Sequence, residues 1–424
     1  MSYPKPLKLV SEELLDVTHY APIVSTIHQY IHREKNLMCG WLDVQETSFT
    51  EERYQIDAIA KEIKKNATML VIVGNGGSVV GTEAILQALN SMPNNEVKVV
   101  FTGNHLSGSA IQAFLNQLQD EKLYVNIISK SGTTFETLVA FRILRNYMEI
   151  RYGDEAKNRM IITTEPNPTN LLNKIADLYE YRTLSIPTNV GGRFSVLTSV
   201  GLLPLQVAGA DIESMLSGAC AAQLDLMSPS LEENVAYQYA VHRAQYYNRG
   251  YNVELLASFE PQLRGLHEWW VQLFAESEGK EGKGLYPTSA TFSKDLHSIG
   301  QFIQQGSPIL FETMLRFTNL PDDFQLTDEH MGELDKQLPV LSLNTMNGMM
   351  AESVIKAHRE AKIPIVELIA ERYDAYHIGY MLYFFMKACT MSAFLLKVNP
   401  FDQPGVEAYK EHMHKLMTEG ELLK

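Results

Sequence analysis

The stretch MLVIVGNGGSVVGTEAILQAL, residues 69–89, indicates the fold class of this chain. Its first five residues are all apolar and mostly β-branched, as in a strand that is buried on both faces of a sheet. The glycine turn Gly74–Ser78 follows directly and opens a helical pattern that ends near Leu89. A buried strand, a short turn and a helix in this order form the repeating unit of α/β proteins.

The alternation of strands and helices continues on the C-terminal side. We predict strands at residues 97–101, 123–128 and 160–163, a helix at residues 106–118, and a further helix that residues 129–137 open. Strands that alternate with helices predict a parallel sheet covered on both faces. The ligand site of such a sheet lies at the carboxyl ends of its strands.

A second unit of the same kind follows a glycine-containing crossover at residues 189–212, which predicts a domain boundary near residue 205. Its strands are expected near residues 253–258, 309–311, 340–343 and 363–367, with a surface excursion at the acidic residues 320–334. The predicted organisation is a peripheral helical N-terminal arm at residues 1–66, a first α/β domain at 67–205, and a second α/β domain with a C-terminal helix at 206–424.

The composition is typical of a soluble globular protein, with 45% hydrophobic and 20% charged residues among 424. The net charge of −14 argues against nucleic-acid or membrane-surface partners, and any anionic ligand therefore needs a local positive site. Cys39, Cys220 and Cys389 form neither a metal-site spacing nor a disulfide framework, which favours a reducing cytoplasm. The first residues lack the apolar core of a signal peptide.

One segment, residues 377–396, is nearly long enough to span a bilayer. Lys387 stands at its middle and acidic residues precede it, which is unusual for a membrane span. We therefore expect this segment to be a buried helix of a large α/β core.

Two polar turns follow predicted strands and open predicted helices. In SKSGTT, residues 129–134, the hydroxyls of Ser131, Thr133 and Thr134 stand beside backbone N–H groups at a helix N-terminus, which suits a phosphate group. In GNGGS, glycine backbone and the hydroxyl of Ser78 offer the same chemistry. Each turn alone could be only a helix cap, whereas the pair at neighbouring strand ends favours a binding site. Neither turn has the Walker spacing or the dinucleotide spacing G-x-G-x-x-G.

The stretch EPQLRGLHEWWVQLFAESEGKEGKGLYPTSATFSKDLHSIGQ, residues 260–301, contains a candidate general base. The apolar stripe of its first helix consists of Leu266, Trp269, Trp270 and Leu273. Glu276 lies one step further along this stripe, with Gln272 four residues before it, so we expect a partly buried carboxylate suited to a general base. The alternative is that Glu276 is only the solvated end of the helix.

Residues 277–284 have the polar, glycine-containing pattern of a loop, and a second helix follows it. Asp295 is expected to cap this helix and to bring His297 to the junction between helix and loop. His297 could equally be only part of the cap. Arg193 follows two glycines in VGGRFS, where it could meet a ligand or simply close the crossover between the domains.

The last predicted helix carries Lys410 on the same apolar stripe as Val406 and Met413. A lysine that points inward needs an anion or a carboxylate beside it. The neighbouring residues His412 and His414 face different sides of a helix, and no helix presents two ligands at zinc-site spacing, so we expect no metal site.

Four motifs in this order, VGGRFSVLT, EWWVQLFAESEGK, DLHSIGQFIQQG and VNPFDQPGVEAYK, resemble those of the phosphoglucose isomerase family in its shorter bacterial form. The resemblance covers the chain from about residue 40 to the C-terminus. It implies two sugar-isomerase-type (SIS) α/β domains, a homodimer, and no metal or organic cofactor. The implied reaction is the aldose–ketose interconversion of glucose 6-phosphate and fructose 6-phosphate, a step of glycolysis and gluconeogenesis, through a cis-enediol intermediate.

The resemblance also implies roles for individual residues. Glu276 matches the base that moves a proton between C1 and C2, and Arg193 matches the residue that steadies the enediolate. His297 and Lys410 match the pair associated with ring opening, and the partner subunit supplies the equivalent of His297 in this family. The implied substrate-binding residues are Gly77, Ser78, Ser129, Lys130, Ser131, Thr133, Thr134, Gln272 and Gln403.

The chain departs from the family pattern at Asn75, where an aliphatic residue is usual, and at residues 356–365 and 160–182. Asn75 adds an amide beside the pocket and leaves the sugar preference open. Three alternatives remain: an isomerase of other sugar phosphates, a non-catalytic sugar-phosphate sensor, and an oligomeric scaffold. Mannose 6-phosphate would test the first, the presence of Glu276 and Lys410 argues against the second, and turnover would exclude the third.

Overall fold

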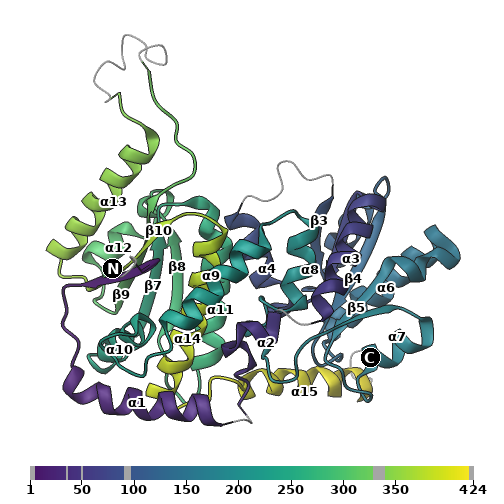
Figure 1. The fold of residues 1–424 in the computed structure, drawn as a ribbon, viewed down its shortest axis with the longest axis horizontal. Helices are drawn as coiled ribbons and strands as arrows, with labels where there is room; N and C mark the ends of the chain where they lie inside the picture. Colours follow the sequence, from purple (N-terminus) through teal and green to yellow (C-terminus); the bar gives the residue numbers. More distant parts are fainter. Residues whose placement is uncertain (1–4, 35–36, 49–50, 90–96, 328–339, 420–424) are drawn as a thin grey trace.

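The computed structural model describes residues 5–34, 37–48, 51–89, 97–327 and 340–419. It contains two five-stranded sheets, and helices pack around and between them (Figure 1). The helices are α1 (Val17–Arg33), α2 (Val44–Ser48), α3 (Glu52–Asn66), α4 (Val80–Ala88), α5 (Gly108–Gln117), α6 (Phe135–Tyr152), α7 (Leu171–Tyr179), α8 (Ser199–Val207), α9 (Ile212–Asp225), α10 (Val235–Asn248), α11 (Arg264–Glu278), α12 (Gly300–Gln305), α13 (Leu343–Glu360), α14 (Ala375–Leu395) and α15 (Pro404–Glu419).

The first sheet is entirely parallel, with the strand order β3-β2-β4-β5-β6. Its strands are β2 (Met69–Val73), β3 (Lys98–Thr102), β4 (Leu123–Ile128), β5 (Met160–Thr164) and β6 (Arg182–Ser185). Alternate residues of β2 belong to different cores: Leu70 and Ile72 pack with the main core, and Val71 and Val73 pack with the core under α6 and α7. Both faces of this sheet are therefore covered, as the apolar run predicted.

The second sheet has the order β1-β10-β9-β7-β8, and only β1 runs antiparallel to its neighbour. Its strands are β1 (Leu7–Ser11), β7 (Val253–Ser258), β8 (Tyr286–Thr291), β9 (Leu310–Asn319) and β10 (Ile365–Arg372). Two parallel-rich sheets with helices on their faces confirm the predicted α/β class. The predicted division at residue 205 falls within α8 and stays a prediction.

Two predictions about secondary structure are wrong. Residues 1–66 are not wholly helical, because Leu7–Ser11 forms the edge strand β1 against β10. Residues 340–343 form no strand; the Ser342 hydroxyl accepts a hydrogen bond from the Thr345 N–H at 3.2 Å and caps α13. A local cap thus outweighs a short apolar run. Of the predicted excursion at 320–334, residues 320–327 lie in the loop after β9, and the others lie outside the described residues.

Helix α14 runs through the centre of the main core, where it packs against α9, α10 and α11. It crosses α9 so closely that a Cβ atom added at Gly379 would lie 1.9 Å from the Met215 carbonyl oxygen. Among the described residues, α14 is the single helix long and apolar enough to cross a membrane, and 89% of its most apolar window is buried inside the protein. The predicted core helix is confirmed.

Helices α4 and α11 join the two halves of the molecule. At their crossing, a Cβ atom added at Gly265 would lie 2.8 Å from the Ala84 Cα atom, so only glycine permits this approach. Because α4 follows β2 and its glycine turn, the crossing brings one face of α11 to the carboxyl edge of the first sheet.

Candidate active site

Helix α11 presents Gln272 and Glu276 on a half-buried face. Its predicted apolar stripe lies beside that face and is buried, at Leu266, Trp269, Trp270 and Leu273. The helix continues through Glu278 and ends at Gly279, two residues beyond the predicted start of the loop. The Glu276 side chain is 28% exposed, so its carboxylate is held by the protein and still open to a ligand.

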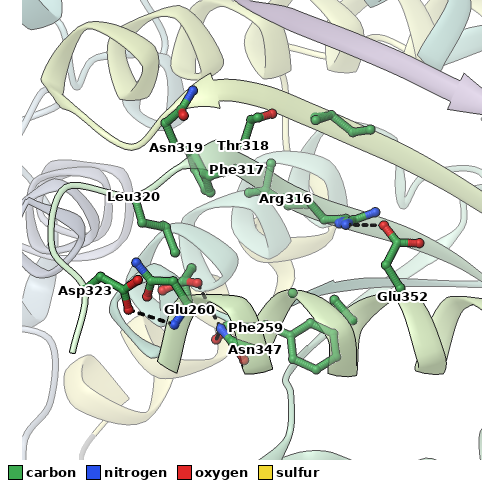
Figure 2. A pocket seen from close by; sticks show the side chains of 15 residues that line it. Phe259, Glu260, Arg316, Phe317, Thr318, Asn319, Leu320, Asp323, Asn347 and Glu352 are labelled. Carbon is green, nitrogen blue, oxygen red and sulfur yellow. Dashed lines mark hydrogen bonds and ion pairs between the residues drawn. The ribbon is translucent and has the colours of Figure 1, made fainter. Parts of the chain in front are cut away.

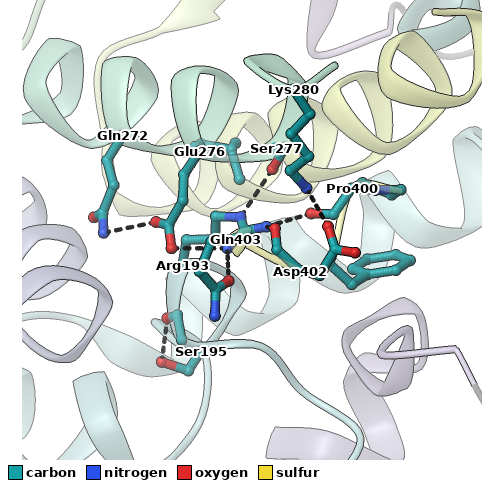
Figure 3. A network of polar contacts seen from close by, with 12 residues as sticks. Arg193, Ser195, Gln272, Glu276, Ser277, Lys280, Pro400, Asp402 and Gln403 are labelled. Carbon is teal, nitrogen blue, oxygen red and sulfur yellow. Dashed lines mark hydrogen bonds and ion pairs between the residues drawn. The ribbon is translucent and has the colours of Figure 1, made fainter. Parts of the chain in front are cut away.

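Arg193 and Gln272 hold the Glu276 carboxylate from two sides (Figure 3). The Arg193 side chain is only 3% exposed, and its Nη1 atom lies 3.0 Å from Glu276 Oε1. Gln272 Nε2 donates to Glu276 Oε2 at 3.3 Å. The other amide atom of Gln272, Oε1, is buried without a hydrogen-bond partner. Each carboxylate oxygen therefore has a separate donor.

The guanidinium of Arg193 also holds the chain segment that precedes α15. Its Nη1 atom donates to Gln403 Oε1 at 3.1 Å, and its Nη2 atom donates to the carbonyl oxygens of Pro400 and Asp402. Its Nε atom donates to the Ser277 hydroxyl at 2.9 Å. Arg193 thus closes a junction of chain segments and also faces the candidate base, while its contact with a ligand stays a prediction.

The first glycine turn lies against the Arg193 loop. The turn forms the short helix η2 (Gly76–Ser78), and Arg193 lies in η4 (Gly192–Phe194). A Cβ atom added at Gly77 would lie 2.5 Å from the Arg193 backbone nitrogen, so this approach requires glycine. A Cβ atom at Gly76 would lie 3.2 Å from Gln272 Nε2. The turn therefore borders the same space as Arg193 and Gln272, with Ser78 half-buried at its end.

The second turn places its hydroxyls at the N-terminus of the 18-residue helix α6. Ser129 Oγ lies 3.1 Å from Thr134 Oγ1, and Thr133 Oγ1 donates to Ser131 Oγ at 3.0 Å. Ser131 and Thr133 are exposed, whereas Ser129 is buried. Because β2 pairs directly with β4, both predicted turns lie at one edge of the sheet. Exposed hydroxyls at a helix N-terminus suit an anion.

A polar side chain that sequence reasoning missed shapes this second turn. Asn170 donates to the Lys130 carbonyl oxygen at 3.0 Å and to Thr164 Oγ1 at 2.9 Å. Its Oδ1 atom would lie 1.9 Å from a Cβ atom at Gly132, which has a φ of 68° and so requires glycine. The sequence contained one signal for this residue: asparagine often caps helices, and Asn170 directly precedes α7.

Lys130 ties the second turn to the segment that leads to Arg193. Its Nζ atom donates to the carbonyl oxygens of Thr188 at 2.9 Å and Val190 at 2.8 Å. Burial lowers the pKa of Lys130 from its usual value. Backbone carbonyl groups of the protein therefore hold the ammonium group of Lys130.

His297 and Lys410 lie apart from this network within one chain. His297 is exposed at the end of η6 (Lys294–His297), and α12 begins only at Gly300. Asp295 does not cap that helix, because its Oδ2 atom accepts from the Thr291 N–H at 2.7 Å. The prediction that Lys410 points inward is wrong: it is 48% exposed and pairs with Glu407 at 2.8 Å.

A separate cavity of about 600 Å³ lies at the carboxyl ends of β7 and β9, between β9 and α13 (Figure 2). None of the predicted site residues lines it. Its polar side chains pair with one another: Asn347 donates to Glu260 at 3.1 Å, and Arg316 pairs with Glu352 at 2.6 Å. Within the described parts of the chain, no three His, Cys, Asp or Glu side chains gather as a metal site. We therefore place the candidate active site at Arg193 and Glu276.

Comparisons with known proteins identify the family of this chain. The model of the phosphoglucose isomerase family matches residues 45–308. The chain belongs to the phosphoglucose isomerase family. It is 42% identical to the glucose-6-phosphate isomerase of Staphylococcus epidermidis, over 98% of this chain and 95% of that protein. It is 41% identical to the glucose-6-phosphate isomerase of Symbiobacterium thermophilum, over 95% of this chain and 92% of that protein.

Two solved structures share the fold of this phosphoglucose isomerase family member. A Thermus thermophilus protein described as hypothetical superposes with a TM-score of 0.87 at 27% identity, over 95% of this chain and 96% of that one. The glucose-6-phosphate isomerase of Chlamydia trachomatis superposes with a TM-score of 0.75 at 19% identity, over 93% of this chain and 78% of that one. The predicted fold class is confirmed.

Proposed function

We propose that this chain interconverts glucose 6-phosphate and fructose 6-phosphate at the site around Glu276. Membership of the phosphoglucose isomerase family supports this aldose–ketose isomerisation. The observation that carries the proposal is the partly exposed Glu276 carboxylate, held between the guanidinium of Arg193 and the amide of Gln272.

Glu276 is the proposed base. Isomerisation through a cis-enediol needs one carboxylate that removes a proton from one carbon and returns it to the next. It also needs positive charge where the substrate oxygen becomes anionic. Arg193 supplies this charge beside Glu276, and its other hydrogen bonds keep the guanidinium fixed before substrate arrives. A donor that is already oriented does not have to reorganise during the reaction.

The 6-phosphate is proposed to bind at the second turn. Ser131 and Thr133 expose their hydroxyls at the N-terminus of α6, and the hydroxyls of Ser129 and Thr134 lie 3.1 Å from each other in the same turn. Backbone from Lys130 and Gly77, the hydroxyl of Ser78, and the amides of Gln272 and Gln403 complete the proposed substrate site. Binding energy from the phosphate end orients C1 and C2 at the carboxylate.

Ring opening is assigned to Lys410 and His297, with His297 supplied by a partner in a homodimer. Among the described residues, no hydrogen bond or ion pair joins either side chain to Glu276, which is consistent with a site that a single chain leaves incomplete. A cytoplasmic location is also proposed, because Cys39, Cys220 and Cys389 are free thiols.

Replacing the proposed base tests the function. Glu276→Gln should lower kcat for fructose 6-phosphate by at least roughly 10², because the amide keeps the shape of the side chain and cannot accept the proton. The assay couples glucose 6-phosphate formation to its oxidation in chelator-treated buffer, with mannose 6-phosphate as the competing substrate. A variant that still exchanges the C2 proton of glucose 6-phosphate with deuterated solvent at the wild-type rate would exclude Glu276 as the base.

Mixed dimers test the shared site. Glu276→Gln chains and His297→Ala chains, reassociated after mild unfolding, should regain up to half of the wild-type activity per mixed dimer. This gain arises because one site then carries both lesions and the other carries neither. If native mass spectrometry shows mixed dimers and no activity returns, each chain completes its own site.

A further inference from the structure

A second arginine–carboxylate group lies behind the last turn of α11, outside the proposed active site. Arg243 on α10 pairs with Glu278 at the end of α11, with Nη1–Oε1 and Nη2–Oε2 distances of 3.1 and 3.0 Å. Its Nε atom donates to Glu254 on β7 at 2.9 Å. All three side chains are completely buried. We call Arg243, Glu254 and Glu278 the buried triad.

The buried triad has its hydrogen bonds satisfied. The Tyr239 hydroxyl donates to Glu254 Oε1 at 2.6 Å, and the Thr313 hydroxyl donates to the same oxygen at 2.7 Å. The guanidinium of Arg243 lies 4.0 Å from the centre of the Phe274 ring. The triad thereby joins α10, α11, β7 and β9 at one point.

A buried ion pair of this kind is weak evidence for a role in stability. Burial raises the pKa of Glu278 to about 7, although Arg243 acts in the opposite direction. A carboxyl group whose pKa is raised by folding makes the folded state less favourable as pH rises from 4.5 to about 7. Buried ion pairs in general add little to stability, because desolvation offsets their attraction.

The location of the buried triad relative to Glu276 accounts for its presence. Glu278 is two residues after Glu276, so the two carboxylates point to opposite sides of the same helical turn. Ser277, between them, accepts the hydrogen bond from Arg193 Nε. The loop that follows α11 contains Gly279, Gly282 and Gly284. Because glycine backbone is conformationally free, this loop restrains the end of the helix only weakly.

We propose that Arg243 and Glu278 are positioning residues that fix the last turn of α11, and with it the carboxylate of Glu276 against Arg193. A bidentate pair restrains both the rotation of the turn and its movement along the helix axis. Misplacement of a reacting group by about 1 Å can lower a rate roughly 10²-fold. This proposal rests on the proposed role of Glu276 as the base.

The test is Glu278→Gln. The amide presents an N–H group to one Nη atom of Arg243, so the bidentate pair is lost while the volume is kept. We expect kcat to fall about 10- to 100-fold. The KM for fructose 6-phosphate and the inhibition constant of inorganic phosphate should change less than about threefold, because the second turn is untouched. Arg243→Lys keeps the positive charge but cannot form the bidentate pair, so it should also lower kcat with little change in KM. This variant replaces Glu278→Gln in the test if Glu278→Gln folds poorly.

A matched control separates position from stability. Glu312 is also completely buried and pairs with His358 at 2.7 Å, on β9 and α13, away from α11. Glu312→Gln should change kcat less than about twofold, even where its melting temperature falls as far as that of Glu278→Gln.

The proposal fails if Glu278→Gln and Arg243→Lys both fold and keep the wild-type kcat, or if kcat in all three variants simply follows the folded fraction. Glu276→Gln, measured in parallel, distinguishes the two proposals. An inactive Glu276→Gln beside a normal Glu278→Gln rejects only the positioning role. An active Glu276→Gln rejects the proposed base.

Discussion

The last turn of α11 lies between two arginine–carboxylate groups that differ mainly in exposure. On one side, Arg243 meets Glu254 and Glu278, and none of these side chains is exposed. On the other side, Arg193 is almost as deeply buried, and Glu276 is 28% exposed. The Arg193–Glu276 and Arg243–Glu278 pairs have the same N–O distance, 3.0 Å between an Nη atom and a carboxylate oxygen.

This difference shows that the pair alone does not identify an active site. Arg243 directs its donors to two carboxylates, so its charge is neutralised inside the protein. Arg193 has one carboxylate partner and donates its other hydrogen bonds to neutral oxygens of Ser277, Pro400 and Gln403. Positive charge therefore remains available beside an open carboxylate, as stabilisation of an enediolate requires.

Among the substitutions that test this comparison, the largest effect on turnover is expected from Arg193→Lys. Lysine keeps the charge but cannot place separate donors on Glu276, Ser277 and Gln403. Loss of an oriented donor to a developing oxyanion lowers kcat by roughly 10² to 10³, and we expect a decrease of this size. The measurement is kcat in the coupled assay, together with a thermal melt that reports the folded fraction.

Arg182→Lys is a matched control for this substitution. Arg182 pairs with Glu62 at 2.8 Å and lies over the Tyr124 ring, at the opposite edge of the first sheet from the two turns. Its replacement should leave kcat within about twofold of wild type, because surface pairs contribute little. Equal losses in both variants would mean that Arg193 acts only by closing the chain segments around it.

Local sequence patterns predicted the elements that carry this comparison. The apolar stripe of α11 and the two turns after β2 and β4 depend on neighbouring residues, which periodicity detects. The pairing of Arg193 with Glu276 depends on the crossing of α4 and α11, which no local pattern contains. The family motifs indicated that both residues belong to one site, whereas the role of Asn170 appeared only with the structure.

The sequence-based predictions that were wrong or incomplete also have physical explanations. The stripe of α15 predicted an inward Lys410, but Val406 and Met413 are only half-buried, so this helix has no deep core to face. The edge strand β1 was missed because it has only five residues and its pairing partner, β10, is far away in the sequence. Arg243 was missed because Glu254 and Glu278 meet it only through tertiary packing.

A smaller effect on turnover is expected from the phosphate end of the proposed site. Ser131→Ala removes an exposed hydroxyl of the second turn, and a hydrogen bond to a charged group contributes roughly 1.5–3 kcal/mol. The KM for fructose 6-phosphate should rise about 10- to 100-fold with little change in kcat, the opposite of the result for Arg193→Lys. Inorganic phosphate should also inhibit more weakly.

Ser107→Ala is the control for the loss of a hydroxyl at a helix N-terminus. Ser107 caps α5 after the neighbouring strand β3, and its Oγ accepts from the Ala110 N–H at 3.4 Å. This variant should lower stability by about 1 kcal/mol and leave KM unchanged. If phosphate inhibition is the same in Ser131→Ala and wild type, the phosphate binds elsewhere.

A third buried cation, Lys387 on α14, extends the comparison because no carboxylate neutralises it. Within the described residues, no hydrogen bond or ion pair joins Lys387 to Asp or Glu; its Nζ atom lies 3.4 Å from His32 Nε2. Burial lowers the pKa of Lys387 to about 8 and the pKa values of His28 and His32 to about 4. The buried charge of Lys387 therefore lowers the free energy of unfolding at neutral pH.

Lys387→Met should leave turnover unchanged and change the pH dependence of stability. The pKa of Lys387 is about 8 in the folded state and 10.5 in the unfolded state, so the unfolded chain binds more protons between these values. The free energy of unfolding of the wild type should therefore rise with pH across this window, by no more than roughly 3 kcal/mol, and Lys387→Met should lack this rise. Cys39 acts in the opposite direction above pH 9, since burial raises its pKa to about 12. The charge of Lys387 lowers the pKa of Cys39, so this opposing effect is larger in Lys387→Met, and the two proteins are compared only below pH 9. Denaturant unfolding at several pH values measures the difference in the free energy of unfolding between wild type and Lys387→Met. The substitution of an exposed lysine, Lys61→Met, is the control. If this difference does not change from pH 8 to 9, Lys387 keeps the pKa of an ordinary lysine despite its burial.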